Sequence, residues 1–158
     1  MPRATPLEQW RVGRTEVAAA LRETPLDHEF PWYGSQLTPA LMIPLRLMET
    51  WAHGQGIYDA VDVPHPPANR LRHVAALGVI GRELSFHTVQ LPPSGPLLPR
   101  DPDDQTWTWG PENAEQQVHG SAADFCLRVT RRRSLEETEL VAVGEDARTW
   151  LEVARVFL

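Results

Sequence analysis

The stretch L-R-L-M-E-T-W-A-H-G-Q, residues 45–55, is the part of the chain from which the rest is best interpreted. Its apolar residues have helical spacing, and its one carboxylate and one imidazole, Glu49 and His53, stand four residues apart. Residues at i and i+4 share a helix face with Cβ atoms about 6 Å apart, so both side chains can bind one metal ion. Imidazole and carboxylate suit zinc, and also nickel or iron. The alternative, an ordinary solvent-exposed pair, stays open at this point.

The helix that carries this pair is expected to begin at Thr38 and Pro39, a cap followed by a first-turn proline, and to end near Ala60. Pro44 lies inside this range. A proline inside a helix removes a hydrogen bond and costs about 3 kcal/mol. We therefore expect the helix either to be interrupted at Pro44 or to become regular only from there.

Other elements follow from the same reading of the sequence. Residues 6–23 and 70–87 have helical apolar spacing, and the proline-rich residues 61–69 between the second and third helices form a loop in which His65 is expected to be solvated. Residues 91–104 have the composition of a linker. Beyond it we expect a strand at 106–109, short helices that begin at Gly110 and at residue 120 or 121, a strand at 140–143 and a final helix at 145–157.

Composition limits the classes of function. The 158 residues suffice for one domain with a small appendage, and the net charge of -6 argues against non-specific nucleic-acid binding, because Arg131 to Arg133 is the one basic run. The single cysteine, Cys126, excludes an internal disulfide, lies in an apolar run that suits the core, and fits a reducing cytoplasm. With neither a signal peptide nor a membrane-spanning stretch, the chain is expected to be soluble and cytoplasmic, with no membrane partner.

Motifs along nearly the whole chain carry a resemblance to one family. They are the run at 45–55, P-W-Y-G at 31–34, R-L-R-H-V-A-A-L-G at 70–78, W-T-W-G-P-E at 107–112 and D-F-C-L-R-V-T-R-R-R at 124–133. Together they resemble the DinB-like, mycothiol-dependent maleylpyruvate isomerases of actinobacteria. The resemblance implies a mainly α fold with a small α/β tail: a partial DinB-like up-down helical bundle at 1–90, the linker at 91–104, and a C-terminal segment at 105–158.

The resemblance also implies a metal site. Members of the family hold a divalent metal, usually zinc, with a His from an earlier helix and the Glu and His that match Glu49 and His53. The earlier His has no counterpart here, and Gly56 stands where the family commonly has an Asp. The tail is similar to a sterol-carrier-like segment and to a wyosine base formation domain. Transfer-RNA chemistry is not inferred from that name, because one cysteine cannot hold the iron–sulfur cluster that it requires.

The implied chemistry is a mycothiol-dependent isomerisation or thiol transfer on a small electrophilic acid. Arg82 is the candidate catalytic residue, because an arginine facing a bundle cavity can hold a carboxylate. An exposed Arg82 paired with Glu83 is the alternative.

Three explanations of the missing ligand are open. The chain is a truncated or split product, or a partner chain supplies the histidine, with His28 and His73 as candidates, or the fold serves as a non-catalytic homodimeric binding or interaction module. The first is favoured, because apolar residues such as Trp51 and Leu77 otherwise lose the helices that cover them.

Overall fold

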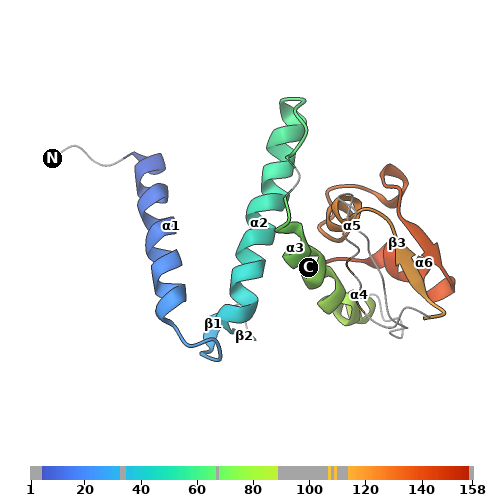
Figure 1. Ribbon diagram of the computed structural model, residues 1–158, viewed down its shortest axis with the longest axis horizontal. Coiled ribbons are helices and arrows are strands. Elements are labelled where there is room, and N and C mark those ends of the chain that lie inside the picture. The colour runs from blue at the N-terminus through green and yellow to red at the C-terminus, as the bar shows by residue number, and fades with distance from the viewer. Residues whose placement is uncertain are drawn as a thin grey trace. The chain divides into compact units, whose positions relative to one another are not determined.

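The computed structural model describes residues 5–32, 35–66, 68–88, 107, 109 and 114–156. The chain divides into two compact units, Met1–Arg46 and Leu47–Leu158, and each is described by itself (Figure 1). Helices dominate, and two small antiparallel sheets accompany them, so the predicted fold class is confirmed. The predicted linker at 91–104 lies outside the described residues, and the two boundaries that it forms with its neighbouring segments stay predictions.

The first unit begins with α1 (Pro6–Glu23), with the bounds that the sequence predicts. A capping box starts it: the Thr5 backbone N donates to Glu8 Oε2 at 2.7 Å, and the Glu8 backbone N donates to Thr5 Oγ1 at 3.3 Å. Pro6 occupies the first turn, where its missing N–H costs nothing. No residue of α1 is buried, and its apolar side chains Leu7 and Trp10 are 53% and 56% exposed.

A short hairpin follows α1. Strands β1 (Phe30–Trp32) and β2 (Ser35–Leu37) pair antiparallel, with Phe30 opposite Leu37. Thr38 then leads into α2 (Pro39–Ala60), and its carbonyl accepts a hydrogen bond from the Met42 N at 2.8 Å. The helix runs through Pro44, so the predicted start at Thr38 and Pro39 is confirmed and the alternative start at Pro44 is wrong.

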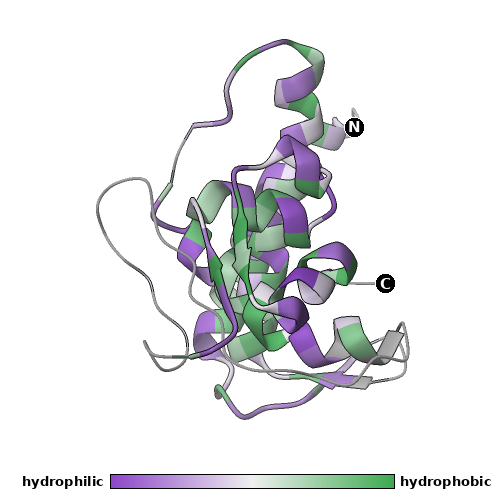
Figure 2. Ribbon diagram, turned by 90° about the vertical axis from the view of Figure 1, so that its right-hand side faces the viewer, coloured by the Kyte–Doolittle hydropathy of each residue, from purple (hydrophilic) through white to green (hydrophobic). Residues whose placement is uncertain are grey.

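The core of the second unit lies where α3 (Leu71–Ile80) packs on α5 (Ala122–Val129). A Cβ on Gly78 would lie 2.9 Å from the Phe125 ring, so the glycine permits this close approach. The Phe125 ring in turn lies 5.6 Å from the ring of Trp150 on α6 (Glu145–Val153), and both side chains are fully buried. Figure 2 shows apolar and polar residues alternating around the helices.

The predicted single helix at 70–87 is wrong in one respect, because it breaks at Gly81 into α3 and α4 (Arg82–Thr88). The physical reason is a set of hydrogen bonds around the Ser85 hydroxyl, which is fully buried. Its Oγ donates to the carbonyls of Gly81 and Arg155, and it accepts from the Arg155 N, all within 3.1 Å. Gly81 fits in this turn because a Cβ there would approach the Arg155 carbonyl to 3.2 Å.

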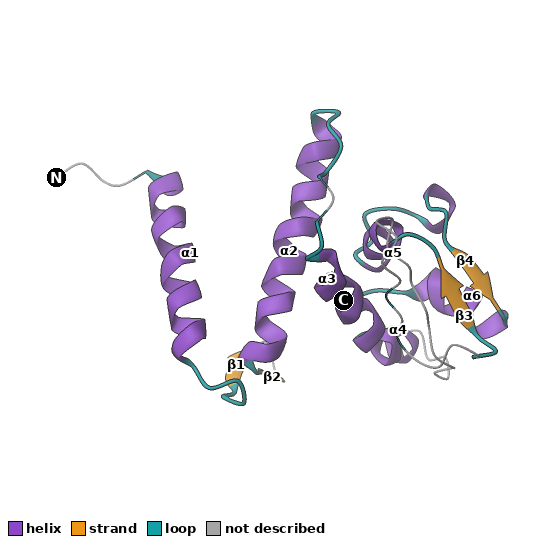
Figure 3. Ribbon diagram, in the orientation of Figure 1, coloured by secondary structure: helices purple, strands orange, loops and turns teal. Residues whose placement is uncertain are grey.

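The tail contains the second small sheet, in which β3 (Gln117–His119) and β4 (Val141–Val143) lie side by side (Figure 3). The strand predicted at 140–143 and the helix start near Ser121 are confirmed. A 3-10 turn, η1 (Leu135–Glu137), connects α5 to β4. Most of the strand predicted at 106–109 and the start of the helix predicted at Gly110 fall outside the described residues.

The last helix ends at Val153, four residues before the predicted end at 157. Hydrogen bonds from Arg128 and from Val156 take the place of those that a longer helix would form. Arg128, which is buried, donates from Nε to the Leu151 carbonyl at 2.8 Å and from Nη2 to the Glu152 carbonyl at 2.6 Å, so it satisfies carbonyls that a longer helix would bond. The Val156 N donates to the carbonyl of Val129 at 2.9 Å, which fixes the segment after α6 against the end of α5.

Candidate metal and anion site

Glu49 and His53 lie together on the second-unit part of α2. Glu49 Oε2 is 3.2 Å from His53 Nε2, and the two side chains are 42% and 72% exposed. The i,i+4 proximity predicted from the sequence is therefore present. Zinc–nitrogen and zinc–oxygen bonds of about 2.0–2.2 Å at a tetrahedral angle place two such donor atoms about 3.3 Å apart. The observed separation and the nitrogen–oxygen donor set fit half of a zinc site.

The pair lines one wall of a groove of about 410 Å³, which we call the arginine groove. The other wall comes from the end of α5 and from the segment after α6. The lining residues are Met48, Glu49, Ala52, His53, Val129, Thr130, Arg131, Arg132, Arg155 and Val156. Three arginines therefore line the same groove as one glutamate and one histidine. The excess of positive charge favours an anionic ligand.

Arg131 has an unusual backbone. Its φ is +58°, in the left-handed region that usually holds glycine at the end of a helix. The Arg131 N donates to the Arg128 carbonyl at 3.1 Å, and the Arg132 N donates to that of Leu127 at 2.8 Å, which is the Schellman pattern. A non-glycine residue there costs roughly 1–2 kcal/mol. Such strain at a groove wall is typical of a functional position.

The guanidinium groups differ in how they are held. Arg131 Nη2 donates to the Val153 carbonyl at 2.9 Å. Burial and then the neighbouring Arg155 cation lower the pKa of Arg131. The Nε atoms of Arg132 and Arg155 are buried and have no hydrogen-bond partner among the described residues. Buried donors without a partner carry a free-energy cost in the folded chain.

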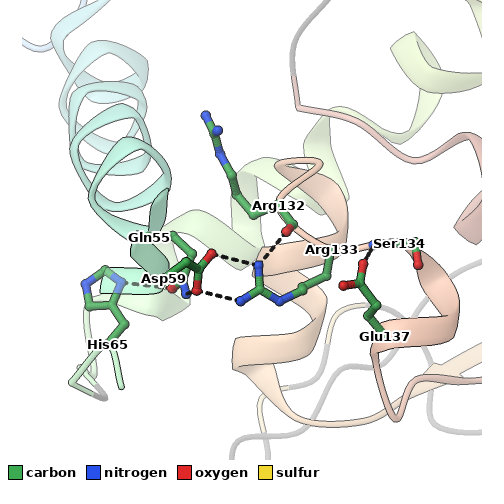
Figure 4. Close-up of polar contacts among 7 residues, drawn as sticks. All are labelled: Gln55, Asp59, His65, Arg132, Arg133, Ser134 and Glu137. Carbon is green, nitrogen blue, oxygen red and sulfur yellow. Dashed lines mark hydrogen bonds and ion pairs between the residues drawn. The ribbon is translucent and has the colours of Figure 1, made fainter. Parts of the chain in front are cut away.

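A network of hydrogen bonds beside the groove holds the turn at residues 131–133 against α2. Arg133 donates from Nη2 to Asp59 Oδ1 at 2.6 Å and from Nη1 to Asp59 Oδ2 at 2.9 Å (Figure 4). Gln55 Nε2 donates to Asp59 Oδ1 at 2.8 Å. Arg132 points away from this network in Figure 4. Arg133 thus fixes the turn, while its neighbour Arg132 is available to the groove.

The remaining predicted site residues lie elsewhere. Arg82, half-buried at the start of α4, is not among the residues that line the arginine groove. His28 lies before β1 in the first unit, and His73 is exposed on α3. Gly56 on α2 is exposed. Within the part of the chain that the structure describes, no three His, Cys, Asp or Glu residues are placed to hold one metal ion.

Two further expectations can be scored. Cys126 is fully buried, and burial raises the pKa of its thiol, so the prediction of a core cysteine is confirmed. His65 was expected in solvent, and it is only partly exposed. Its ring stacks on Tyr58 at 4.3 Å and on Trp51 at 5.6 Å, and burial lowers its pKa.

Sequence reasoning did not assign Arg131, Arg132 and Arg155 to the site. The signal for the first two was their membership of the one basic run in an acidic chain. Arg155 has no comparable signal, because only the fold brings it beside Glu49.

No helix among the described residues has the length and apolar composition to cross a bilayer.

Comparisons with known proteins agree with the motifs. The family model for the mycothiol maleylpyruvate isomerase N-terminal domain matches residues 1–58, and the wyosine base formation model matches residues 101–143. Two uncharacterized proteins of Mycobacterium tuberculosis, one from strain CDC 1551 / Oshkosh and one from strain ATCC 25618 / H37Rv, are each 45% identical to this chain over 154 residues.

The match covers 96% of this chain and 60% of each relative, so the chain spans less than two thirds of their length. No solved structure matches significantly. Residues 1–58 of the chain are therefore similar to the mycothiol maleylpyruvate isomerase N-terminal domain family, and residues 101–143 are similar to the wyosine base formation family.

Proposed function

We propose that this chain carries part of a divalent-metal site of the DinB-like type, at which a low-molecular-weight thiol reacts with a small electrophilic acid. Glu49 and His53 bind the metal, with zinc as the first candidate. Arg131, Arg132 and Arg155 bind the carboxylate of the acid. The observation that carries the proposal is the 3.2 Å Glu49–His53 pair on one wall of a groove whose other wall bears the three arginines.

The donor set and the charges support separate parts of this proposal. A divalent metal held by Glu49 and His53 would lower the pKa of a thiol or water bound to it and so supply a thiolate or hydroxide at neutral pH. Its remaining ligands would come from solvent, from the substrates or from residues beyond the described part of this chain. The family match makes mycothiol the first candidate for the thiol, and isomerisation or thiol S-transfer the candidate reactions.

The arginines would act on the acid. In an isomerisation of this kind, the thiol adds to a double bond conjugated with a carboxyl or carbonyl group, the new single bond rotates, and the thiol leaves again. Negative charge develops on the conjugated oxygen when the thiolate adds. Preorganised guanidinium groups beside that oxygen stabilise this charge. We assign the carboxylate-binding role to the groove arginines rather than to Arg82, because they share the groove with Glu49 and His53.

The environment in the cell is also part of the proposal. A fully buried free thiol and a thiol cosubstrate both suit the reducing cytoplasm. The partners we propose are therefore the small acid, the thiol and a second chain or segment that completes the metal site.

Calorimetric zinc titration tests the metal assignment. We expect the wild-type chain to bind zinc, and His53→Ala and Glu49→Gln to weaken binding by at least about tenfold, since each removes a ligand. The matched control is His119→Ala, which removes a half-buried histidine from β3. Zinc affinity that is the same in His53→Ala as in the wild type would contradict the assignment.

The second candidate is a non-catalytic homodimeric ligand-binding or interaction module. The observation that favours it is α1, a capped helix whose apolar side chains Leu7 and Trp10 are more than half exposed. Light scattering with and without chelator separates the two candidates. A dimer of unchanged mass after chelation, together with no zinc binding, supports the module. Zinc binding by the pair supports the metal site.

A further inference from the structure

A second groove lies on a different face of α2. Its α2 residues, among them Leu47, Trp51, Gly54 and Tyr58, recur every three to four positions and therefore share one side of the helix. The opposite wall is formed by the loop at His65 and by the start of α3. The volume is about 430 Å³. This groove shares no residue with the arginine groove, so an argument about it is independent of the proposed function.

The His65 ring lies nearly parallel to two other rings in this groove. The His65 ring is 4.3 Å from Tyr58 with an angle of 22° between the planes, and 5.6 Å from Trp51 with an angle of 21°. A hydrogen bond fixes the His65 ring, since Nδ1 lies 3.1 Å from Oε1 of Gln55, which is buried (Figure 4). Gln55 is held in turn by Asp59. Flat rings fixed in parallel suit the stacking of another flat ring.

The groove carries a positive charge. Arg70 lines it, and no described residue of its lining is a carboxylate, although the chain as a whole carries a net charge of -6. The rest of the lining is largely aliphatic, including Leu71 and Val74. A largely apolar site of this volume with one or two fixed polar groups has the usual properties of a small-molecule site.

We propose that this groove, which we call the ring groove, binds a flat aromatic molecule that carries one negative group. The aromatic part stacks with Trp51, Tyr58 and His65, and the negative group pairs with Arg70 at the rim. The site acts independently of metal binding at Glu49 and His53.

Fluorescence titration of the full chain with two probes tests the proposal. The anionic probe is 8-anilinonaphthalene-1-sulfonate, and the neutral probe is N-phenyl-1-naphthylamine, which has the same rings without the sulfonate. We expect Arg70→Gln to lower the affinity for the anionic probe by about fivefold and to leave the affinity for the neutral probe unchanged. The matched control, Arg72→Gln, removes an exposed arginine of α3 that does not line the groove, and we expect it to change neither probe.

Variants of the rings locate the probe. Trp51→Leu and Tyr58→Leu should each lower the affinity for both probes by about threefold or more, because each removes a stacking surface. His65→Phe keeps a flat ring and should retain binding, which guards against an effect of misfolding. Trp10→Ser, which removes an exposed aromatic residue of α1, should have no effect.

Three results would overturn the proposal. The first is an unchanged affinity for both probes in Trp51→Leu and Tyr58→Leu, and the second is a loss of binding in Trp10→Ser. The third is an equal change in the affinities for the two probes in Arg70→Gln. Unchanged probe binding in His53→Ala is also expected. This result separates the ring groove from the metal site, so that either assignment can fail without the other.

Discussion

Asp59 accepts two hydrogen bonds from Arg133 and one from Gln55, and these interactions, the Arg133 bonds first, lower the pKa of its carboxyl from 3.8 to about 2. A lowered folded-state pKa stabilises the fold fully above the unfolded pKa, and this stabilisation is lost as the pH falls through the folded value. We therefore predict that Asp59→Asn lowers the melting temperature between pH 5 and 7, and that its difference from the wild type disappears between about pH 4 and pH 2. Thermal unfolding followed by circular dichroism measures this. Asp62→Asn, a nearby exposed carboxylate, is the control, and a difference for Asp59→Asn that is constant down to pH 2 would refute the account.

Arg131 combines backbone strain with a place in the arginine groove. Replacing it by glycine relieves a strain of roughly 1–2 kcal/mol and loses the hydrogen bond to the Val153 carbonyl, worth about 1 kcal/mol. We predict that Arg131→Gly stays within about 1 kcal/mol of the wild-type stability in urea but binds maleate, a small unsaturated diacid, about fivefold more weakly in a calorimetric titration. Unchanged maleate affinity would argue against an anionic ligand in this groove.

At the residue scale, the sequence predicted contacts between residues that are near one another in the chain, and it did not predict contacts between residues that are far apart in the chain. Glu49 and His53 share a helix turn, so their spacing alone placed them together. Arg155 lies in the same groove because Ser85 forms hydrogen bonds with its backbone and because the Val156 N donates a hydrogen bond to the Val129 carbonyl. No helix or strand spacing relates Arg155 to Glu49, so the sequence could not show that the two residues line one groove.

The contact between α3 and α5 depends on one glycine. A Cβ on Gly78 would lie 2.9 Å from Phe125 Cε1 and 3.0 Å from Val129 Cγ2, and both neighbours are fully buried. We predict that Gly78→Ala destabilises the fold by about 1–3 kcal/mol through overpacking. Gly56→Ala on α2 is the matched control: a Cβ there meets no atom of the described residues within 4 Å, so better helix propensity should stabilise the fold by up to about 1 kcal/mol. Urea denaturation distinguishes the two, and equal effects would contradict the packing described here.

Among the elements, those with strong local signals were predicted best. The first-turn prolines Pro6 and Pro39 indicated the starts of α1 and α2. The break at Gly81 and the early end of α6 were missed, because Ser85 and Arg128 impose them through contacts distant in sequence. The three residues of β3 were missed because so short a strand has little pattern of its own.

For the whole molecule, the motifs predicted the fold class and the similarity to one family, and both are confirmed. The chain spans 60% of the length of its relatives, and among its described residues no third metal ligand lies beside Glu49 and His53. The central claim is that Glu49 and His53 still bind a divalent metal.

Zinc content per chain tests this claim most directly. The protein is purified, dialysed without chelator and analysed by elemental mass spectrometry, beside His53→Ala and the control His119→Ala. We predict about one zinc per chain in the wild type and in His119→Ala, and little or none in His53→Ala. A wild-type chain without zinc, or zinc retained in full by His53→Ala, would contradict the account.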